Sequence, residues 1–141
     1  MKVKRLRENA KLPTYGSDGA AGLDLYTDKD VVVEPGEIKV ATTGISLEIP
    51  SGMVGDIRPR SGFATKYGIT VINSPGTIDE DYRGEIMVSL VNHGKTSFHI
   101  PSGTRVAQLV VLNYNRVELE EVVELTETER GEGRHGSTGE K

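Results

Sequence analysis

The sequence contains no cysteine and no tryptophan, only two phenylalanines and only three histidines. The lack of cysteine excludes disulfides and thiolate metal sites. His93, His99 and His135 have no metal-ligand spacing, so a zinc site is not expected. Any metal should be a hard cation held by carboxylates, water or a substrate. The sequence has neither a membrane-length apolar run nor a recognisable signal peptide, so we expect no membrane partner and a cytoplasmic location.

The net charge of −4 argues against a nucleic-acid partner, because nucleic-acid binders present a basic face. A phosphorylated small molecule remains compatible, since a few local arginines reverse the local potential. The 141 residues fit one domain. Abundant glycine, at 17 residues, and few aromatics predict many tight turns around a core of Val, Ile and Leu.

Short apolar runs with a period of two residues dominate the chain and indicate β-strands. The clearest is Glu85–Asn92, where both alternating sets are mostly apolar, so we expect both faces to be covered. The pattern predicts an all-β fold, a β-sandwich or barrel-like roll. The other predicted strands are Val3–Leu6, Leu23–Tyr26, Val31–Val33, Ile38–Thr42, Ile45–Ile49, Met53–Arg58, Ile69–Ile72, Ser97–Ile100, Val106–Leu112 and Val117–Val122.

One short helix is predicted, with Ser61 as its cap and Gly68 as its stop. After Leu125 the composition changes, and residues 126–141 contain no aliphatic side chain that could join a core. We therefore divide the chain into a β-rich domain, 1–125, and a flexible glycine-rich C-terminal segment, 126–141. That segment is either a disordered tail or a lid that closes over a ligand.

Three polar positions at the ends of predicted elements are candidates for binding phosphate or metal. In Arg60-Ser61-Gly62, amides at a helix start, a hydroxyl and a guanidinium form a potential oxyanion site; the alternative is an ordinary cap beside a surface arginine. Asp24, among small and apolar residues, either holds a metal-bound water or accepts bonds from a turn. Gln108 either donates to a phosphate oxygen or simply begins a strand.

The segment from Asn73 to Glu85 is longer and more acidic than a hairpin turn needs. Its backbone groups and Asn73 can meet a flat base edge, Tyr82 can pack on a sugar, and Asp79 can orient and deprotonate water. A solvated acidic turn is the alternative.

Near the C-terminus, the spacing from Gly131 to Gly136 imitates a phosphate-binding Walker loop. Ser137 stands where that loop has lysine, and no strand and helix flank the segment, so the Walker interpretation fails. What remains is a glycine-rich strap, with Arg130 and Arg134 as charges, that could close over a phosphate and expel water.

Taken in order, these five segments resemble the motifs of the trimeric dUTPase family, the deoxyuridine triphosphate nucleotidohydrolases. The resemblance covers nearly the whole chain. It implies a jelly-roll-like β fold, a homotrimer with three active sites at subunit interfaces, and hydrolysis of dUTP to dUMP and pyrophosphate. The matching stretches are Ala21-Gly22-Leu23-Asp24-Leu25-Tyr26, Pro59-Arg60-Ser61-Gly62, Gly76-Thr77-Ile78-Asp79-Glu80-Asp81-Tyr82-Arg83-Gly84-Glu85, Arg105-Val106-Ala107-Gln108-Leu109 and the tail from Arg130 to Gly139.

The resemblance also implies a role for each site residue. Asp79 would activate the water that attacks the α-phosphorus, and Tyr82 would lie under the deoxyribose and exclude a ribose 2′-hydroxyl. Asn73 and the neighbouring hairpin backbone would bind uracil. The substrate-binding residues implied by the hairpin are Asn73, Gly76, Thr77, Ile78 and Tyr82.

The remaining implied roles concern the triphosphate. Asp24 would bond to waters on a Mg²⁺ ion chelated by the three phosphates. Arg60 would add charge from an adjoining subunit, and Arg130 would clamp the γ-phosphate. Ser61, Gly62 and Gln108 would hold phosphate oxygens, and His135, Gly136 and Ser137 would belong to the closing tail.

The tail departs from the family pattern, which usually has Gly-Gly-Phe-Gly with the phenylalanine stacked on uracil. This chain has Gly133-Arg134-His135-Gly136, so His135 would either stack on the base or approach a phosphate. Two other functions fit less well. A dCTP deaminase would need a catalytic glutamate and a tryptophan in the hairpin, and a non-catalytic nucleotide-sensing trimer would not need a lid.

Overall fold

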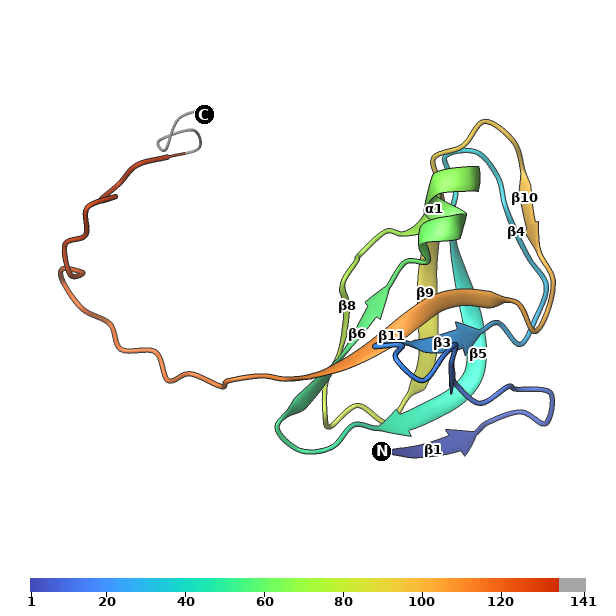
Figure 1. Ribbon diagram of the computed structural model, residues 1–141, viewed down its shortest axis with the longest axis horizontal. Coiled ribbons are helices and arrows are strands. Elements are labelled where there is room, and N and C mark those ends of the chain that lie inside the picture. Colours follow the sequence, from blue (N-terminus) through green and yellow to red (C-terminus); the bar gives the residue numbers. More distant parts are fainter. Residues whose placement is uncertain (135–141) are drawn as a thin grey trace.

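The computed structural model describes residues 1–134 and has the predicted all-β architecture with one short helix (Figure 1). The helix, α1 (Ser61–Tyr67), lies between β6 and β7 in the chain. The strands are β1 (Lys2–Arg5), β2 (Thr14–Tyr15), β3 (Leu23–Tyr26), β4 (Val31–Val33), β5 (Ile38–Glu48), β6 (Met53–Arg58), β7 (Ile69–Val71), β8 (Gly76–Ile78), β9 (Glu85–Asn92), β10 (Phe98–Ile100) and β11 (Arg105–Asn113).

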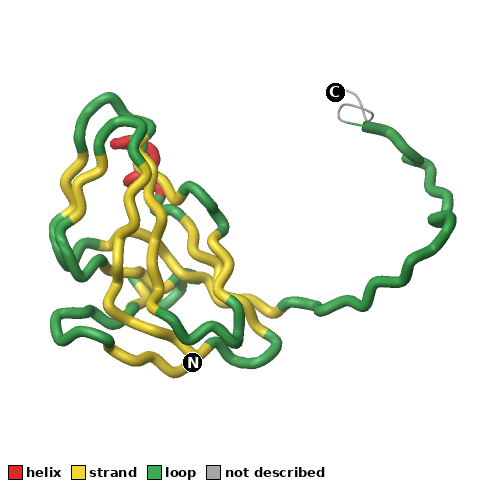
Figure 2. The backbone as a smooth tube through the Cα atoms, turned by 180° about the vertical axis from the view of Figure 1, so that it is seen from behind, coloured by secondary structure: helices red, strands yellow, loops and turns green. Residues whose placement is uncertain are grey.

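Two antiparallel sheets share one core. A four-stranded sheet has the order β1-β5-β9-β7 and a five-stranded sheet the order β2-β3-β11-β6-β8, while β10 and β4 form a separate pair. Leu25 and Leu109 from the larger sheet and Ile86 from the smaller one are fully buried in a single cluster. Each such side chain contributes about 1.5–3 kcal/mol when it leaves water. In Figure 2 the helix lies at one end of the strands.

Strand β5 is continuous where the sequence predicted two strands. Its register against β9 shifts between Thr42 and Ser46, and Gly44 lies within this irregularity at φ +69°. A Cβ on Gly44 would lie 2.7 Å from Ala10 Cβ, so both backbone conformation and space favour glycine. The strand therefore continues past the glycine through a bulge instead of ending there.

Both alternating faces of β9 were predicted to be covered, and this is wrong at Met87, which is 47% exposed. Ile86, Val88 and Leu90 on the other face are buried in the core. Met87 lies opposite Thr42 on β5, on the outer side of the four-stranded sheet. An apolar side chain on that outer face lies at the surface of the single chain.

The hairpin predicted around residues 73–85 forms, but the connection between its two strands contains a further short strand, β8. Strands β7 and β9 pair antiparallel, with Val71 opposite Leu90. Between them the chain crosses to the other sheet, where β8 pairs with β6 and Gly76 is buried opposite Ile57. The segment is therefore not a fully solvated turn, because its backbone completes the edge of the five-stranded sheet.

The predicted role of Ser61 as helix cap is wrong. Arg60 occupies the cap position with extended backbone, without a side-chain capping bond, and Ser61 is the first helical residue. The predicted stop is confirmed, since Gly68 adopts φ 71° and its amide bonds to the Ala64 carbonyl. In the described part of the chain no helix is long and apolar enough to cross a bilayer.

Beyond Asn113, residues 114–134 leave the β body as an extended arm without helix or strand (Figures 1 and 2). The predicted strand Val117–Val122 is wrong: its apolar positions are exposed, Leu119 at 96%. Alternating side chains form a strand only where a neighbouring strand accepts their backbone hydrogen bonds.

A buried ionic cluster joins three distant segments of the β body. Asp28 is 2% exposed and accepts hydrogen bonds from the Thr42 hydroxyl and from Arg7 Nε. Burial alone would raise the pKa of Asp28, but these bonds and the charge of Arg7 outweigh it and lower the pKa. The cluster therefore requires an ionised Asp28.

Acid should weaken the fold partly through Asp28. Because its pKa is lower in the folded chain, its ionised form stabilises the protein fully above about pH 4, and this contribution disappears as pH falls below that value. Asp28→Asn should cost about 1.5–3 kcal/mol at neutral pH, the range for a hydrogen bond to a charged group, since Arg7 keeps Glu85 as a partner. Urea unfolding from pH 2.5 to 7 should give a shallower acid dependence for this variant than for wild type and for Asp18→Asn, an exposed control. Equal slopes in all three proteins would contradict the assignment.

Candidate active site

The pairing of three neighbouring strands brings distant polar segments together. In the five-stranded sheet, β11 lies between β3 and β6. Gln108 on β11 is opposite Asp24 on one side and Arg58 on the other. Residues directly opposite on adjacent strands point to the same face, so these three side chains form a row across the sheet.

The row opens into a cleft of about 420 Å³ at the start of α1. The cleft collects five of the predicted site residues, namely Asp24, Arg60, Ser61, Gly62 and Gln108. The side-chain amide of Gln108 donates to the Pro59 carbonyl over 3.0 Å. This bond fixes the orientation of Gln108 where β6 leads into the helix.

Two arginines bracket Asp24, whose side chain is only 13% exposed. Arg105 Nη1 lies 3.1 Å from Asp24 Oδ2, and Arg60 Nε lies 3.5 Å from Oδ1. An acid with so little exposure is costly to bury without a cationic partner, and these two guanidinium groups supply it. Arg60 Nη1 also donates to the Arg105 carbonyl over 3.1 Å. The cleft wall carries two guanidinium groups, those of Arg58 and Arg60, and one carboxylate, and Arg105 adds a third guanidinium through its bond to Asp24.

Sequence reasoning missed Arg105 as a member of this site. The register of β11 against β3 shifts between Arg105 and Ala107. Such a bulge changes the face of the sheet to which a residue points, and a simple alternation of faces does not predict it. Spacing alone therefore gave no signal that the Arg105 guanidinium reaches Asp24.

Asp79 and Tyr82 lie elsewhere on the chain. They line a hollow of about 260 Å³ with Thr77 and Ile78 of β8 and with exposed apolar residues of β5 and β9. Tyr82 Oη donates to the Glu85 carbonyl over 2.9 Å, and the Tyr82 amide donates to the Asp79 carbonyl over 3.2 Å. Asn73 is exposed, and its amide nitrogen lies 3.2 Å from the position of a Cβ on Gly76.

The cleft and the hollow lie at opposite ends of β6. Ser61 follows Arg58 at the end of β6, whereas Asp79 follows Ile78, which is opposite Gly55. Gly55 and Arg58 are three residues apart, roughly 10 Å along a strand. The two lining sets have no residue in common. One chain therefore presents the predicted residues as two separate half-sites.

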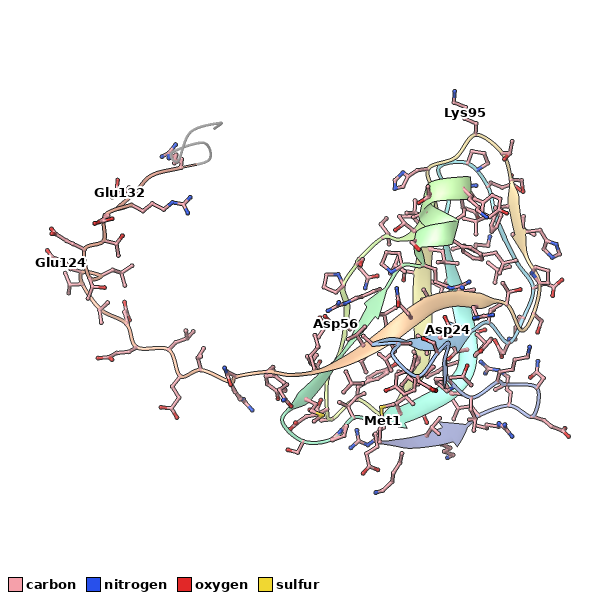
Figure 3. All side chains as sticks on the ribbon, in the orientation of Figure 1. Met1, Asp24, Asp56, Lys95, Glu124 and Glu132 are labelled. Carbon is pink, nitrogen blue, oxygen red and sulfur yellow. The ribbon has the colours of Figure 1, made fainter. Side chains whose placement is uncertain are left out.

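The C-terminal arm begins beside the Asp79 segment, since Tyr114 and Arg116 line a hollow of about 480 Å³ with Thr77 and Asp79, and then leaves the β body. Figure 3 places Glu124 and Glu132 on the arm, away from Asp24 and Asp56 on the β body. Within this arm, Arg130 Nε donates to the Gly133 carbonyl over 3.2 Å. The predicted residues His135, Gly136 and Ser137 lie outside the described residues.

The donor set of the cleft fits a magnesium ion that takes most of its ligands from water and a bound phosphate ligand. Across residues 1–134, no group of three or more His, Asp or Glu side chains is arranged to hold a metal. Asp24 contributes a single carboxylate at the cleft. Magnesium commonly uses one or two carboxylates together with phosphates and water.

Known proteins of one family match the chain over nearly its whole length. The dUTPase family model matches residues 8–139. The chain is also 50% identical over 141 residues to the deoxyuridine 5′-triphosphate nucleotidohydrolase of Alkaliphilus metalliredigens, covering 100% of this chain and 98% of that protein. This chain belongs to the dUTPase family.

Solved dUTPase structures share the fold. The Staphylococcus bacteriophage 80alpha dUTPase with dUpNHpp has a TM-score of 0.92 and 30% identity, over 98% of this chain and 97% of that one. A mutant dUTPase from phage phi11 of S. aureus has a TM-score of 0.82 and 28% identity, over 87% and 96%. The latter structure reveals the coordination of a structural Mg(II) ion in that protein.

The cleft of this dUTPase-family chain should depend on the glycine at position 22. A Cβ there would lie 2.6 Å from Gln108 Oε1 and 3.2 Å from Gln108 Cβ. Gly22→Ala should therefore turn the Gln108 amide away from Pro59, which two-dimensional NMR of its side-chain NH₂ group would detect as a shifted pair of resonances. Gly19→Ala is the matched control, because a Cβ there meets nothing within 4 Å. An unmoved Gln108 NH₂ pair in Gly22→Ala would contradict this account of the cleft.

Proposed function

We propose that this chain hydrolyses dUTP to dUMP and pyrophosphate, with magnesium, by attack of an Asp79-activated water on the α-phosphorus. The observation that carries the proposal is the cleft in which Ser61, Gln108 and Arg60 meet Asp24, beside membership of the dUTPase family. A hydroxyl, an amide and a guanidinium that converge on one space suit an anion with several oxygens.

The cleft is the proposed triphosphate half of the active site. The Ser61 hydroxyl and Gln108 amide bind phosphate oxygens, and the amides of Ser61 and Gly62 precede the first bonds within α1, which run from Phe63 and Ala64 to the Arg60 carbonyl. Arg60, which the resemblance placed in an adjoining subunit, lies in the same chain's cleft as Ser61 and Gln108 and supplies charge at its rim. Asp24 would hold a magnesium ion through water, and the bound ion would supply further positive charge for the leaving pyrophosphate.

The hollow at the other end of β6 is the proposed nucleoside half. Asn73 and the backbone of Gly76, Thr77 and Ile78 bind uracil, and Tyr82 lies beneath the deoxyribose, where a 2′-hydroxyl would collide with its ring. A pocket shaped against an added group discriminates more strongly than a loose apolar pocket.

Asp79 acts as the general base in this proposal. Its carboxylate accepts a proton from water while the water oxygen bonds to the α-phosphorus. The bond from the α-phosphorus to the bridging oxygen breaks, and that oxygen leaves with pyrophosphate. Asp79 is exposed at the hollow, so water reaches it freely before substrate binds. Alignment of water and phosphorus supplies much of the rate.

We further propose a homotrimer in which the half-sites of different subunits complete each other. Two observations support a self-association of this kind. The half-sites are separated within one chain, and the hollow containing Asp79 is bordered by Val40 and Met87, which are 51% and 47% exposed. Exposed apolar groups beside an incomplete site favour a protein neighbour over water.

The arm supports a related proposal, in which residues 126–141 form a lid over the substrate. Arg130 would clamp the γ-phosphate, and His135, Gly136 and Ser137 would lie over the bound nucleotide. The extended course of residues 114–134 carries the segment away from its own β body, which suits closure over a site on a neighbouring subunit (Figure 1).

Removal of the Asp79 carboxylate should stop catalysis without removing substrate binding. Asp79→Asn should reduce pyrophosphate release from dUTP by about 10²–10⁴-fold, the usual contribution of a general base. Asp81→Asn, an exposed acid in the same segment, is the matched control and should remain close to wild type. The measurement is pyrophosphate release from dUTP, dCTP, dTTP and UTP, with magnesium and with EDTA.

Each result of this panel discriminates between functions. Wild type should release pyrophosphate from dUTP alone among the four nucleotides, and EDTA should abolish the release. Ammonia from dCTP would indicate a deaminase, and binding of dUTP without turnover would indicate a sensor. Unchanged pyrophosphate release by Asp79→Asn would exclude the assigned base.

A further inference from the structure

A second group of charged side chains lies outside the cleft, where the segment that carries Asp79 enters β9. Arg7 is part of the N-terminal segment, Asp28 follows β3, and Glu85 begins β9. Arg7 Nε donates to Asp28 and Arg7 Nη2 donates to Glu85, while the three side chains are 32%, 0% and 20% exposed. One guanidinium thus joins two carboxylates that are 57 positions apart, at 28 and 85.

Residues at the bulge in β5 form hydrogen bonds with both carboxylates of this cluster. The Gly44 amide donates to Glu85 Oε1 over 2.8 Å, and the Gly44 carbonyl accepts the Leu6 amide over 2.7 Å. The Thr42 hydroxyl donates to Asp28. The Glu85 carboxylate therefore receives a backbone amide and a guanidinium, which together hold it far more rigidly than an exposed surface pair would.

From Glu85 a short chain of hydrogen bonds leads to Asp79. Tyr82 Oη donates to the Glu85 carbonyl over 2.9 Å, and the Tyr82 amide donates to the Asp79 carbonyl over 3.2 Å. Gly84 leaves space for the Tyr82 ring, because a Cβ there would lie 2.3 Å from Tyr82 Oη. The Tyr82 hydroxyl is thus hydrogen-bonded to the backbone of the residue whose carboxylate Arg7 and Gly44 hold.

We propose that Arg7 is a positioning residue for the segment from Asp79 to Glu85. By holding the Glu85 side chain against Gly44, it sets the Tyr82 ring and the Asp79 turn for a deoxyribose nucleotide. The inference rests on the proposed hydrolysis of dUTP. It adds that discrimination between dUTP and UTP depends on an arginine of the N-terminal segment that lines neither the cleft nor the hollow and acts on the hollow through Glu85, one of its lining residues.

The test uses Arg7→Met, Arg7→Lys and Glu85→Ala in the full-length chain. Glu85→Ala leaves the buried Arg7–Asp28 pair in place, so it remains informative if Arg7→Met does not fold. The control is Asp30→Asn, which breaks the hydrogen bonds of Asp30 to His99 and to the Ser102 amide, an interaction of another loop. For each protein, kcat and KM are measured with dUTP and with UTP below its unfolding temperature.

Arg7→Met and Glu85→Ala should lower the ratio of kcat/KM for dUTP over UTP by ~10- to 100-fold, the scale expected for a small misplacement of reacting groups. Arg7→Lys should have a ratio between those of Arg7→Met and wild type. Asp30→Asn should keep the wild-type ratio, whatever the effect of this substitution on stability. Hydrogen exchange at the amides of residues 79–85 should rise in Glu85→Ala but not in Asp30→Asn.

Two different failures are separable. A wild-type chain that does not hydrolyse dUTP overturns the proposed function. In the second failure, the wild type is selective for dUTP, but the variants keep its ratio of kcat/KM for dUTP over UTP, its kcat and its exchange rates in residues 79–85. This result overturns only the role of Arg7.

Discussion

Strand β11 has hydrogen-bonded neighbours on both edges, and its register with them determines where the cleft lies. Gln108 is opposite Asp24 on β3 and Arg58 on β6, so one row across the sheet unites residues from three distant stretches of sequence. The buried side chains of Val106, Ala107 and Leu109 fix that register, because a slip by one residue would turn them outward. The position of the cleft is therefore a direct result of core packing.

The same sheet also explains why the predicted residues do not form one site in one chain. Strand β8 pairs with β6, and its register puts Asp79 near the opposite end of β6 from Ser61. The two half-sites have different chemistry. Guanidinium groups and amides dominate the cleft, whereas the hollow combines Asp79 and Tyr82 with exposed apolar side chains. In the proposed function a triphosphate nucleotide contacts both surfaces, and we propose that a second copy of the chain supplies the missing one.

Sequence patterns predicted most of the β framework because alternation and turn residues are local properties. Glu85–Asn92 and Met53–Arg58 have the predicted bounds, and Gly68 ends the helix as expected. The strand predictions failed where the formation of a strand depends on whether a neighbouring strand is available to pair with it. Val117–Val122 alternates but has no strand beside it, while the short strand β8 forms because β6 offers an unpaired edge. The continuity of β5 through Gly44 depends on a bulge that composition does not reveal.

In the candidate site, too, local motifs were predictable from the sequence and long-range contacts were not. Motif order identified Asp24, Ser61 and Gln108, and the structure brings them into one cleft. Neither the pairing of Arg105 with Asp24 nor the link from Arg7 to Glu85 was foreseen, since both join residues that are more than 75 positions apart in sequence. Contacts of this range follow from sheet topology, which spacing alone does not give.

We propose that each active site combines the cleft of one subunit with the Asp79 hollow of another. Shared sites are tested by mixing Asp79→Asn, which lacks the base in the hollow, with Gln108→Ala, which lacks the phosphate-binding amide of the cleft and is expected to be inactive for that reason, after unfolding and joint refolding. Mixed oligomers contain some sites with an intact cleft facing an intact hollow, so dUTP hydrolysis should reappear at a substantial fraction of the wild-type rate. If the mixture stays as inactive as its two components, although mixed oligomers are present by native mass spectrometry, the sites are not shared.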